Sequence, residues 1–402
     1  MKSEPDSLLV TAVKSLSLRK DRRYLLQSLS LAQWPELLRL TDESRLTLAI
    51  AERAAQYLPD EIRFRLSRDL NRNALRQQRM LETYSEIAAV LNSRGIEFLV
   101  LKGAAQYAPY RQKVACRPQY DIDLYCPGAS AQAAAEAIMS LGYRSVRSTR
   151  GPETDHLPPL VREPEWKWQN DYFDPDLPFS IEIHHRFWNP ARERFDVAAS
   201  EQFWSRRVQL KVDGLVMPAL HPIDALSYAT WHLIRHLVRG DLKIFHVYEL
   251  ALFLKASAAD DAFWSQWRRI AHPKERIVEA IAFRLASGWF DCELHPEVAQ
   301  LMDRMPAPVR KWFDLFEMSP VTSAEIPNKD EVFLHLAVVA GWLNRVRVLR
   351  QRVFPMNPPT VGRGQVQLEF LSRRAAHHLL AIVPVIRSAS LWCFESGAVT
   401  RD

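Results

Sequence analysis

Glycine is scarce in this chain, with 12 residues among 402, whereas proline occurs 25 times. That balance argues against a glycine-rich phosphate-binding loop, which needs several glycines close together. The most apolar late stretch, HHLLAIVPVIR (377–387), is shorter than the roughly 20 residues that span a bilayer. The start, MKSEPDSLLV, carries acidic residues and has no long apolar core. We therefore expect neither a signal peptide nor a membrane segment.

Cysteine is also rare. The chain has four cysteines and none of them forms a C-x-x-C pair, which argues against a structural zinc cluster and against a disulfide framework. Reduced thiols fit this pattern best, so we expect a cytoplasmic protein without a disulfide-linked partner. The four residues are Cys116, Cys126, Cys292 and Cys393.

Neither sign of charge is in large excess. A net charge of +6 over 402 residues is explained by a solvated surface at least as well as by a nucleic-acid partner. The segment 332–394 is locally basic, with eight arginines against one acidic residue. An ordinary amphipathic helix with a charged face explains this segment most simply. The alternative is that it binds RNA, an acidic peptide or a phosphorylated acceptor.

The length and the periodicity predict an α+β protein with more than one core. Residues 74–95 carry apolar side chains at a helical period and end at Gly95. Short β-branched and aromatic runs then alternate with helical segments, which indicates a small mixed β-sheet. Strands are expected over 96–103, 120–126, 143–148, 165–174 and 179–187, and a helix over 129–141.

From these patterns we divide the chain into three regions. An N-terminal helical region (1–94) precedes a sheet domain (95–215), and a C-terminal helical domain (216–402) follows it. Residues 354–365 are typical of an exposed loop. Trp166 and Trp168 would share one face of a strand, where they would close the sheet against a helix or, alternatively, stack on a base.

Two aspartates in the strand 120–126 are the first candidates for chemistry. Residues two apart in a strand point to the same face, so Asp121 and Asp123 project together, while Ile122 and Leu124 face a core. Adjacent carboxylates repel each other unless a cation lies between them, and Mg²⁺ favours oxygen ligands. The alternative is an edge strand with two solvated acids.

Neighbouring segments favour the metal site. Lys102 and Gly103 end a buried strand, where glycine allows close approach of a phosphate and lysine supplies a charge. Glu182 lies on the polar face of the strand 179–187 and would add a third carboxylate. Three acids and bound phosphates can hold two Mg²⁺ ions for a displacement at phosphorus.

These segments together resemble the nucleotidyltransferase superfamily, with its polymerase-beta-like fold. The closer resemblance is to a bacterial family described as uncharacterised nucleotidyltransferases, whose pattern is L-K-G, R-x-x-D-I-D-L, an E-I-H strand and a helix with spaced histidines. The order agrees over about 95 to 255. The matching residues are Leu101-Lys102-Gly103, Arg117, Asp121-Ile122-Asp123-Leu124, Glu182-Ile183-His184, and His232 with His236.

The chain departs from that pattern at three points. Ala104 follows Gly103 where the wider superfamily has Gly or Ser. Arg117 lies four residues before Asp121, where the pattern has about three, and Glu249 stands where the pattern has Asp. The acids of the metal site are unaffected by these departures.

The resemblance implies a role for each matched residue. It assigns two Mg²⁺ ions to Asp121, Asp123 and Glu182, and Glu182 could also activate the attacking hydroxyl. It assigns the triphosphate of ATP or another NTP donor to Lys102, Gly103, Ala104 and Arg117.

Three histidines are further candidates for the nucleotide or acceptor site. His232 and His236 are four apart and share a helical face with Arg235. They either line the substrate cleft or form a polar stripe against the sheet domain, and the absence of an H-E-x-x-H motif argues against a zinc hydrolase. His184 is equally typical of strand packing and of a site wall.

We therefore expect a Mg²⁺-dependent transfer of a nucleoside monophosphate with release of pyrophosphate. The leading form of this hypothesis is transfer of AMP from ATP. The acceptor could be a peptide, a protein, a small molecule or RNA. Two alternatives stay open at this point. One is a catalytically silent nucleotide- or RNA-binding module, and the other is a phosphotransferase that uses the same site.

Overall fold

A computed structural model describes most of the chain. The described residues are 7–106, 116–146, 154–163, 165–197, 200–212, 214–273, 275–353 and 365–394.

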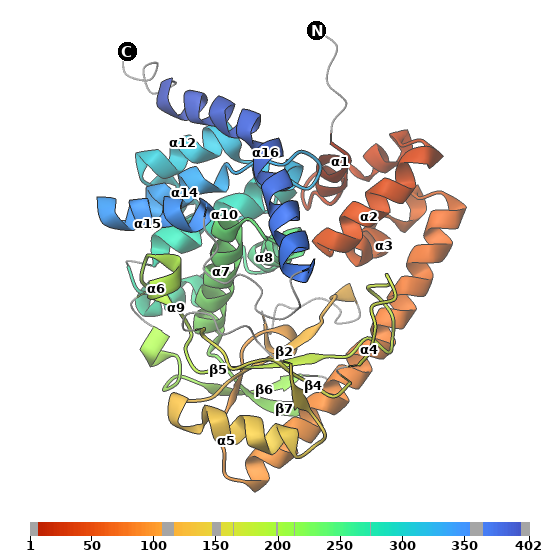
Figure 1. Cartoon of the computed structure of the whole chain (residues 1–402), viewed down its shortest axis with the longest axis vertical. Coiled ribbons are helices and arrows are strands. Elements are labelled where there is room, and N and C mark those ends of the chain that lie inside the picture. Colours follow the sequence, from red (N-terminus) through yellow and green to blue (C-terminus); the bar gives the residue numbers. More distant parts are fainter. Residues whose placement is uncertain are drawn as a thin grey trace.

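The centre of the lower half of the molecule is a seven-stranded mixed sheet with the order β3-β4-β5-β2-β1-β7-β6 (Figure 1). β2 pairs in parallel with β5, and β1 pairs in parallel with β7, whereas all other pairs are antiparallel. The strands are β1 (Leu99–Val100), β2 (Asp121–Tyr125), β3 (Arg144–Ser145), β4 (Leu160–Val161), β5 (Ser180–His184), β6 (Val208–Val212) and β7 (Leu215–Ala219).

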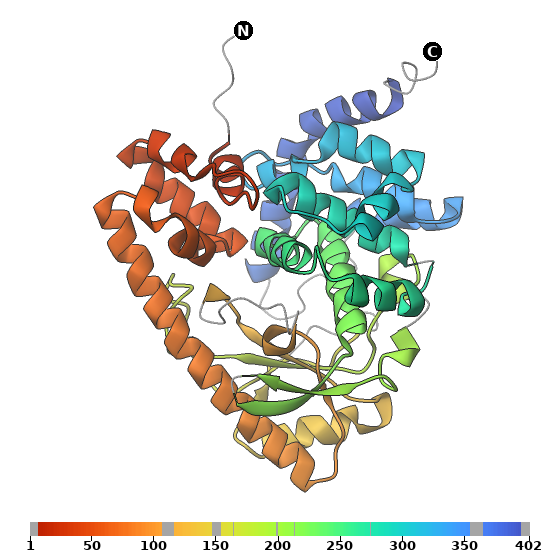
Figure 2. The ribbon, with the colours of Figure 1, turned by 180° about the vertical axis from the view of Figure 1, so that it is seen from behind.

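Two helices cover one face of the sheet. α4 (Asp60–Ser93) and α5 (Gly128–Met139) pack on the apolar side chains of β2 and β5, and α4 runs along the edge of the molecule in both views (Figures 1 and 2). Ile122 and Leu124 are fully buried in this core. Because side chains alternate along a strand, the same burial directs the polar residues of β2 and β5 to the opposite face.

That opposite face looks toward the helices of the C-terminal half, of which α7 stands on the sheet in Figure 1. α7 begins at Pro222, after His221, whose ring accepts a hydrogen bond from the Ile223 amide, and ends before Gly240 with φ +78°. Leu99 in β1 and Leu101 directly after it belong to the same apolar core as α7. The sheet therefore has the apolar layer of α4 and α5 on one face. On its other face, α7 lies against both the polar side chains and the leucines of β1 and the turn after it.

The N-terminal and C-terminal helices share one large core. The N-terminal helices are α1 (Leu8–Ser15), α2 (Trp34–Ser44) and α3 (Thr47–Ala54). The others are α6 (Pro190–Glu193), α7 (Pro222–Arg239), α8 (Ile244–Ala256), α9 (Asp261–Ile270), α10 (Arg276–Phe290), α11 (Pro296–Asp303), α12 (Ala307–Phe316), α13 (Ser319–Thr322), α14 (Glu331–Val338), α15 (Trp342–Val353) and α16 (Gln365–Phe394).

The α+β class and the flanking helical regions are confirmed, and most of the expected elements are present. The prediction of a strand over 165–174 is wrong, because this segment forms turns and irregular backbone. Trp168 there is 45% exposed, so it does not close the sheet against a helix. The predicted loop at 354–365 lies almost entirely outside the described residues, and the division of the chain at residues 94 and 215 stays a prediction.

No disulfide joins the four cysteines, all of which belong to the described part of the chain. Among the described helices, none combines the length and the apolar character that crossing a bilayer requires.

Glu279 of α10 makes the stability of the helical core depend on pH. Its carboxylate accepts hydrogen bonds from Ser227 Oγ (2.6 Å) and Trp267 Nε1 (3.0 Å), and burial raises its pKa to about 7. The unfolded chain loses this proton near pH 4.5, so the free energy of unfolding falls as the pH rises from 4.5 to 7. Above about pH 7 Glu279 is ionised in both states, so its effect on the free energy of unfolding no longer changes with pH.

We therefore predict that Glu279→Gln becomes more stable relative to the wild type across that window, by about 3 kcal/mol in total. The glutamine amide can keep both hydrogen bonds, since it accepts from Trp267 and donates to Ser227. Urea unfolding between pH 4 and 8 measures the difference, with the exposed Glu293→Gln as control. A difference that does not change with pH would show that Glu279 is ionised throughout.

Candidate active site

Asp123 and Glu182 lie side by side on neighbouring strands. β2 and β5 are parallel, and the register pairs Asp123 directly with Glu182 and Asp121 with Ser180. Asp123 is 1% exposed, whereas Glu182 and Asp121 are partly accessible. The structure thus brings together two of the three predicted carboxylates at one point of the sheet, with Asp121 two residues away on the same face.

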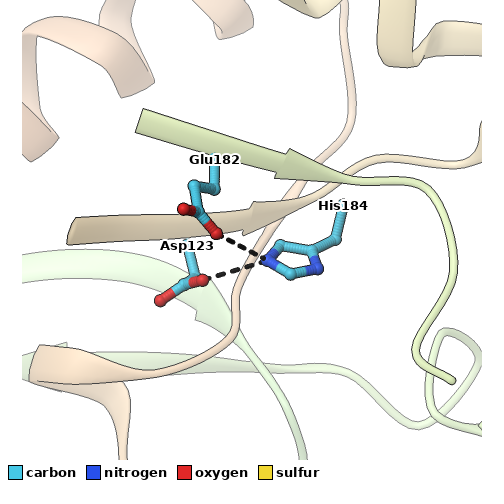
Figure 3. A group of neighbouring side chains, drawn as sticks. All are labelled: Asp123, Glu182 and His184. Atoms are coloured by element: carbon cyan, nitrogen blue, oxygen red, sulfur yellow. Dashed lines mark hydrogen bonds and ion pairs between the residues drawn. The ribbon is translucent and has the colours of Figure 1, made fainter. Parts of the chain in front are cut away.

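His184, two residues after Glu182, completes a cluster with these acids (Figure 3). Its Nε2 lies 3.0 Å from Asp123 Oδ1 and 3.8 Å from Glu182 Oε2. An ionised carboxylate only accepts hydrogen bonds. Nε2 of His184 therefore carries the hydrogen and donates a hydrogen bond to Asp123. Burial lowers the pKa of His184, which favours the neutral ring in this role. His184 therefore orients Asp123 in this arrangement.

The two carboxylates of this cluster fit a divalent cation. One possible ligand atom from each of Asp123, Glu182 and His184 lies within 4.8 Å of the others, but His184 Nε2 cannot be a ligand while it donates to Asp123. Asp123 Oδ1 accepts the bonds in the cluster, while Oδ2 is buried and has no hydrogen-bond partner among the described residues. A buried, unpartnered carboxylate oxygen beside a second carboxylate is the donor chemistry that Mg²⁺ or Mn²⁺ takes.

Lys102 also binds Asp123. Its Nζ lies 2.9 Å from Asp123 Oδ1. Burial alone would raise the pKa of Asp123, but the charge of Lys102 and the hydrogen bond from His184 hold it well below its usual range. Burial would likewise lower the pKa of Lys102, and the charge of Asp123 raises it. Asp123 therefore stays ionised at any physiological pH.

Glu182 behaves in the opposite way. Burial and the nearby charge of Asp123 raise the pKa of Glu182 to about 7. Two carboxylates this close do not both ionise easily without a cation. Adjacent acids with opposite pKa shifts are typical of a functional site.

The turn after β1 is shaped by Gly103. Its φ is +68°, and a Cβ added there would lie 2.1 Å from Gln119 Nε2. That amide donates a hydrogen bond to the Asp121 carbonyl at 2.8 Å, so the turn packs directly on the start of β2. Gly103 begins a short 3₁₀ turn (Gly103–Ala105), and the side chain of Ala104 lies outside what the structure describes.

Arg117 is buried in an ion pair. Its Nε lies 2.6 Å from Glu249 Oε1 on α8, and Gln106 donates to the other oxygen of that carboxylate at 3.1 Å. The Arg117 carbonyl accepts hydrogen bonds from Asn73 and Gln77 of α4. Arg117 therefore ties the segment before β2 to helices on both sides, and contact with a phosphate stays a prediction.

The predicted histidines of α7 join the site through Lys102. Its Nζ lies 3.2 Å from His232 Nε2, which is 3.1 Å from His236 Nε2, and His236 Nδ1 lies 2.8 Å from Asp241 Oδ1. Lys102 donates to the single lone pair of His232 Nε2, and His236 can share that acceptor only when it is protonated on both nitrogens. Burial disfavours that imidazolium, whereas Asp241 favours it. The chain of bonds runs from the exposed Asp241 inward to Asp123.

Sequence reasoning missed Asp155 entirely. Its carboxylate forms an ion pair with Arg235 of α7, and its Oδ2 lies 4.0 Å from His184 Nδ1. The charge of Arg235, against the effect of burial, holds the pKa of Asp155 well below its usual range. Asp155 precedes β4 in an irregular segment, where no periodicity marks it.

Comparisons with known proteins agree with this geometry. The searches of curated proteins and of solved structures found no match. The model of the family described as "Uncharacterised nucleotidyltransferase" matches residues 30–291, which include every strand of the sheet and every residue of the cluster. The chain therefore belongs to the uncharacterised nucleotidyltransferase family.

Proposed function

We propose that this protein is a Mg²⁺-dependent nucleotidyltransferase that moves a nucleoside monophosphate from an NTP, with ATP as the leading donor, to an acceptor hydroxyl or phosphate. The observation that carries the proposal is the direct pairing of Asp123 with Glu182 on parallel strands, in a chain of this family. The acceptor oxygen bonds to the α-phosphorus, the bond to the bridging oxygen breaks, and pyrophosphate leaves with that electron pair.

Asp123 and Glu182 would hold the cation, and Asp121 offers a further carboxylate on the same face. When bound, Mg²⁺ neutralises phosphate charge and polarises the α-phosphoryl group. Glu182 is also the proposed proton acceptor for a hydroxyl acceptor, as the family resemblance implies.

Lys102 has two proposed roles. It neutralises Asp123 before substrate binds, and its ammonium is then positioned for the β- or γ-phosphate of the donor. Gly103, whose φ of +68° favours glycine, would let the triphosphate approach the backbone of the turn. Arg117, His184, His232 and His236 surround these residues and are proposed to shape the nucleotide site.

Isotope transfer tests the proposal. The protein is incubated with Mg²⁺, cell extract and ATP, CTP, GTP or UTP labelled with ³²P at the α or the γ position. We expect α label on an acceptor with the wild type and a loss of at least about 100-fold with Asp123→Asn, because the buried metal ligand is lost. The exposed Asp303→Asn serves as the matched control and should retain full transfer.

The position of the label decides among the alternatives. Label transferred only from the γ position would replace the proposal with phosphotransfer. Nucleotide binding with no transfer of either label would favour a silent binding module. Equal transfer by the wild type and Asp123→Asn would contradict the assigned site.

Replacing Lys102 tests whether a cation at Asp123 is needed for stability. Lys102→Met leaves the buried Asp123 carboxylate without its ion-pair partner, which should lower the free energy of unfolding by about 3 kcal/mol without metal. A divalent ion can replace the missing charge. We therefore predict that Mg²⁺ raises the melting temperature of this variant more than that of the wild type.

The control for this effect is Lys102→Met combined with Asp123→Asn, which removes both charges and should lose the additional Mg²⁺ response. If Mg²⁺ stabilises all forms equally, the ion does not bind at Asp123.

Gly103→Ala tests whether the conformation of the turn after β1 is needed for nucleotide binding. The substitution places a Cβ against Gln119 in a backbone conformation that non-glycine residues avoid, so we expect the affinity for a non-hydrolysable ATP analogue to fall by about tenfold or more. Gly95→Ala is the matched control, because Gly95 has nearly the same φ (+66°) but nothing within 4 Å of an added Cβ.

Calorimetric titration of both variants separates backbone strain from the contact with Gln119. A similar loss of affinity in both would assign the effect to general destabilisation and not to the turn.

A further inference from the structure

A small cavity next to the site belongs to none of the roles above. It has a volume of about 220 Å³ and lies at the start of β2, between the end of α2 and the irregular segment before β5. Three aromatic side chains form much of its wall: Tyr120, Trp168 and Tyr172. Trp168 packs edge-on against Tyr172, with ring centroids 4.9 Å apart, and Tyr172 packs in the same way on Tyr120 at 6.3 Å.

Two cations complete the cavity. The guanidinium of Arg45 lies over the ring of Tyr120, 4.8 Å from its centroid, and Lys243 enters from the segment between α7 and α8. Within the part of the chain that the structure describes, neither cation forms a salt bridge. Glu43 also lines the cavity, but its carboxylate binds Arg39 at 2.7 Å.

The two cations act on each other. Burial and then the charge of Arg45 lower the pKa of Lys243, and the opposing charges of Asp241 and Glu43 do not fully restore it. Holding like charges beside an apolar wall is unfavourable unless an anion binds between them. The aromatic walls and the cations together fit a planar ring that carries an anionic group, since stacking and charge would then both be satisfied.

The cavity is linked to the reaction site through Arg45. Burial and then the charge of Arg45 lower the pKa of His246 on α8, and the His246 ring packs edge-on against His232 with ring centroids 5.3 Å apart. His232 in turn contacts Lys102, which binds Asp123. A ligand at Arg45 would therefore lie at the outer end of this chain of contacts.

We propose that this cavity binds the acceptor, and that the acceptor is recognised as a planar ring bearing a carboxylate or phosphate. Trp168 and Tyr172 stack on the ring, while Arg45 and Lys243 bind the anion. The assignment to the acceptor rests on the proposed nucleotidyl transfer, whereas the binding of such a ligand does not. A neutral base alone would leave both cations without an anionic partner, so the ring must carry its own charge.

Two kinds of molecule share this chemistry, and matched pairs of probes distinguish them. An aromatic carboxylate is represented by 4-hydroxybenzoate, with neutral 4-hydroxybenzamide as its twin. A nucleotide is represented by 5′-AMP, with adenosine as its twin. Calorimetry without metal measures the affinity of each probe. We expect the anion of one pair to bind about tenfold more tightly than its neutral twin.

Three variants separate the contributions. Arg45→Met and Lys243→Met should each reduce the preference for the anion severalfold, while Trp168→Ala should weaken both members of the pair. Trp342→Ala removes a tryptophan of α15 that is 71% exposed, against 45% for Trp168, and should behave like the wild type. Arg45 caps α2 only through its backbone amide, so Arg45→Met should keep the wild-type melting temperature.

Competition with the donor tests the assignment to the acceptor. The preferred probe should stay bound when Mg²⁺ and saturating α,β-methylene-ATP are present. Displacement by this analogue would place the cavity in the donor site and overturn the assignment. No measurable binding, or equal affinity for anion and neutral twin, would overturn the site itself.

Failure of this inference can be told apart from failure of the proposed function. Probe binding that depends on Arg45, Lys243 and Trp168, without any transfer of label, would leave the cavity in place and contradict the transferase. Transfer of label that is unchanged in Trp168→Ala and Arg45→Met would contradict only the cavity as the acceptor site.

Discussion

The burial of one negative charge governs the centre of this protein. Asp123 lies inside the sheet at 1% exposure, and an isolated carboxylate there would be strongly destabilised. Lys102, from the turn after β1, and His184, from β5, both bind its Oδ1. The same charge raises the pKa of Glu182 on the neighbouring strand. The carboxylate of Asp123 thus interacts with side chains from three segments that are distant in the sequence.

This arrangement links stability with function. Lys102 connects Asp123 to the histidines of α7, and His184 lies close to Asp155, which in turn binds Arg235 of the same helix. α7 therefore packs on the polar face of the sheet through ions and imidazoles as well as apolar contacts. The unpartnered oxygen of Asp123 beside Glu182 is compatible with a divalent ion, and the charge of Lys102 is the one that we propose for the phosphates.

Strand periodicity and the family resemblance were sufficient to predict that Asp123 and Glu182 belong to one site. Alternation along two short strands placed Asp123 and Glu182 on polar faces, and the parallel register then made them neighbours. The Asp213-Gly214 pair between β6 and β7 was a hairpin signal that went unused. Asp155 and the aromatic cavity could not be predicted, because irregular segments and contacts between distant helices have no local pattern. Trp166 and Trp168 alternate like strand residues but lie in a turn-rich segment.

The central claim is that Asp123 and its neighbours form a site for divalent cations and a triphosphate. Counting bound Mn²⁺ by electron paramagnetic resonance, with and without α,β-methylene-ATP, tests this claim most directly. The account predicts that the wild type binds Mn²⁺, that the analogue increases the number of ions bound, and that Asp123→Asn abolishes the effect. Mn²⁺ binding that is absent, or that is the same in the wild type and Asp123→Asn, would contradict it.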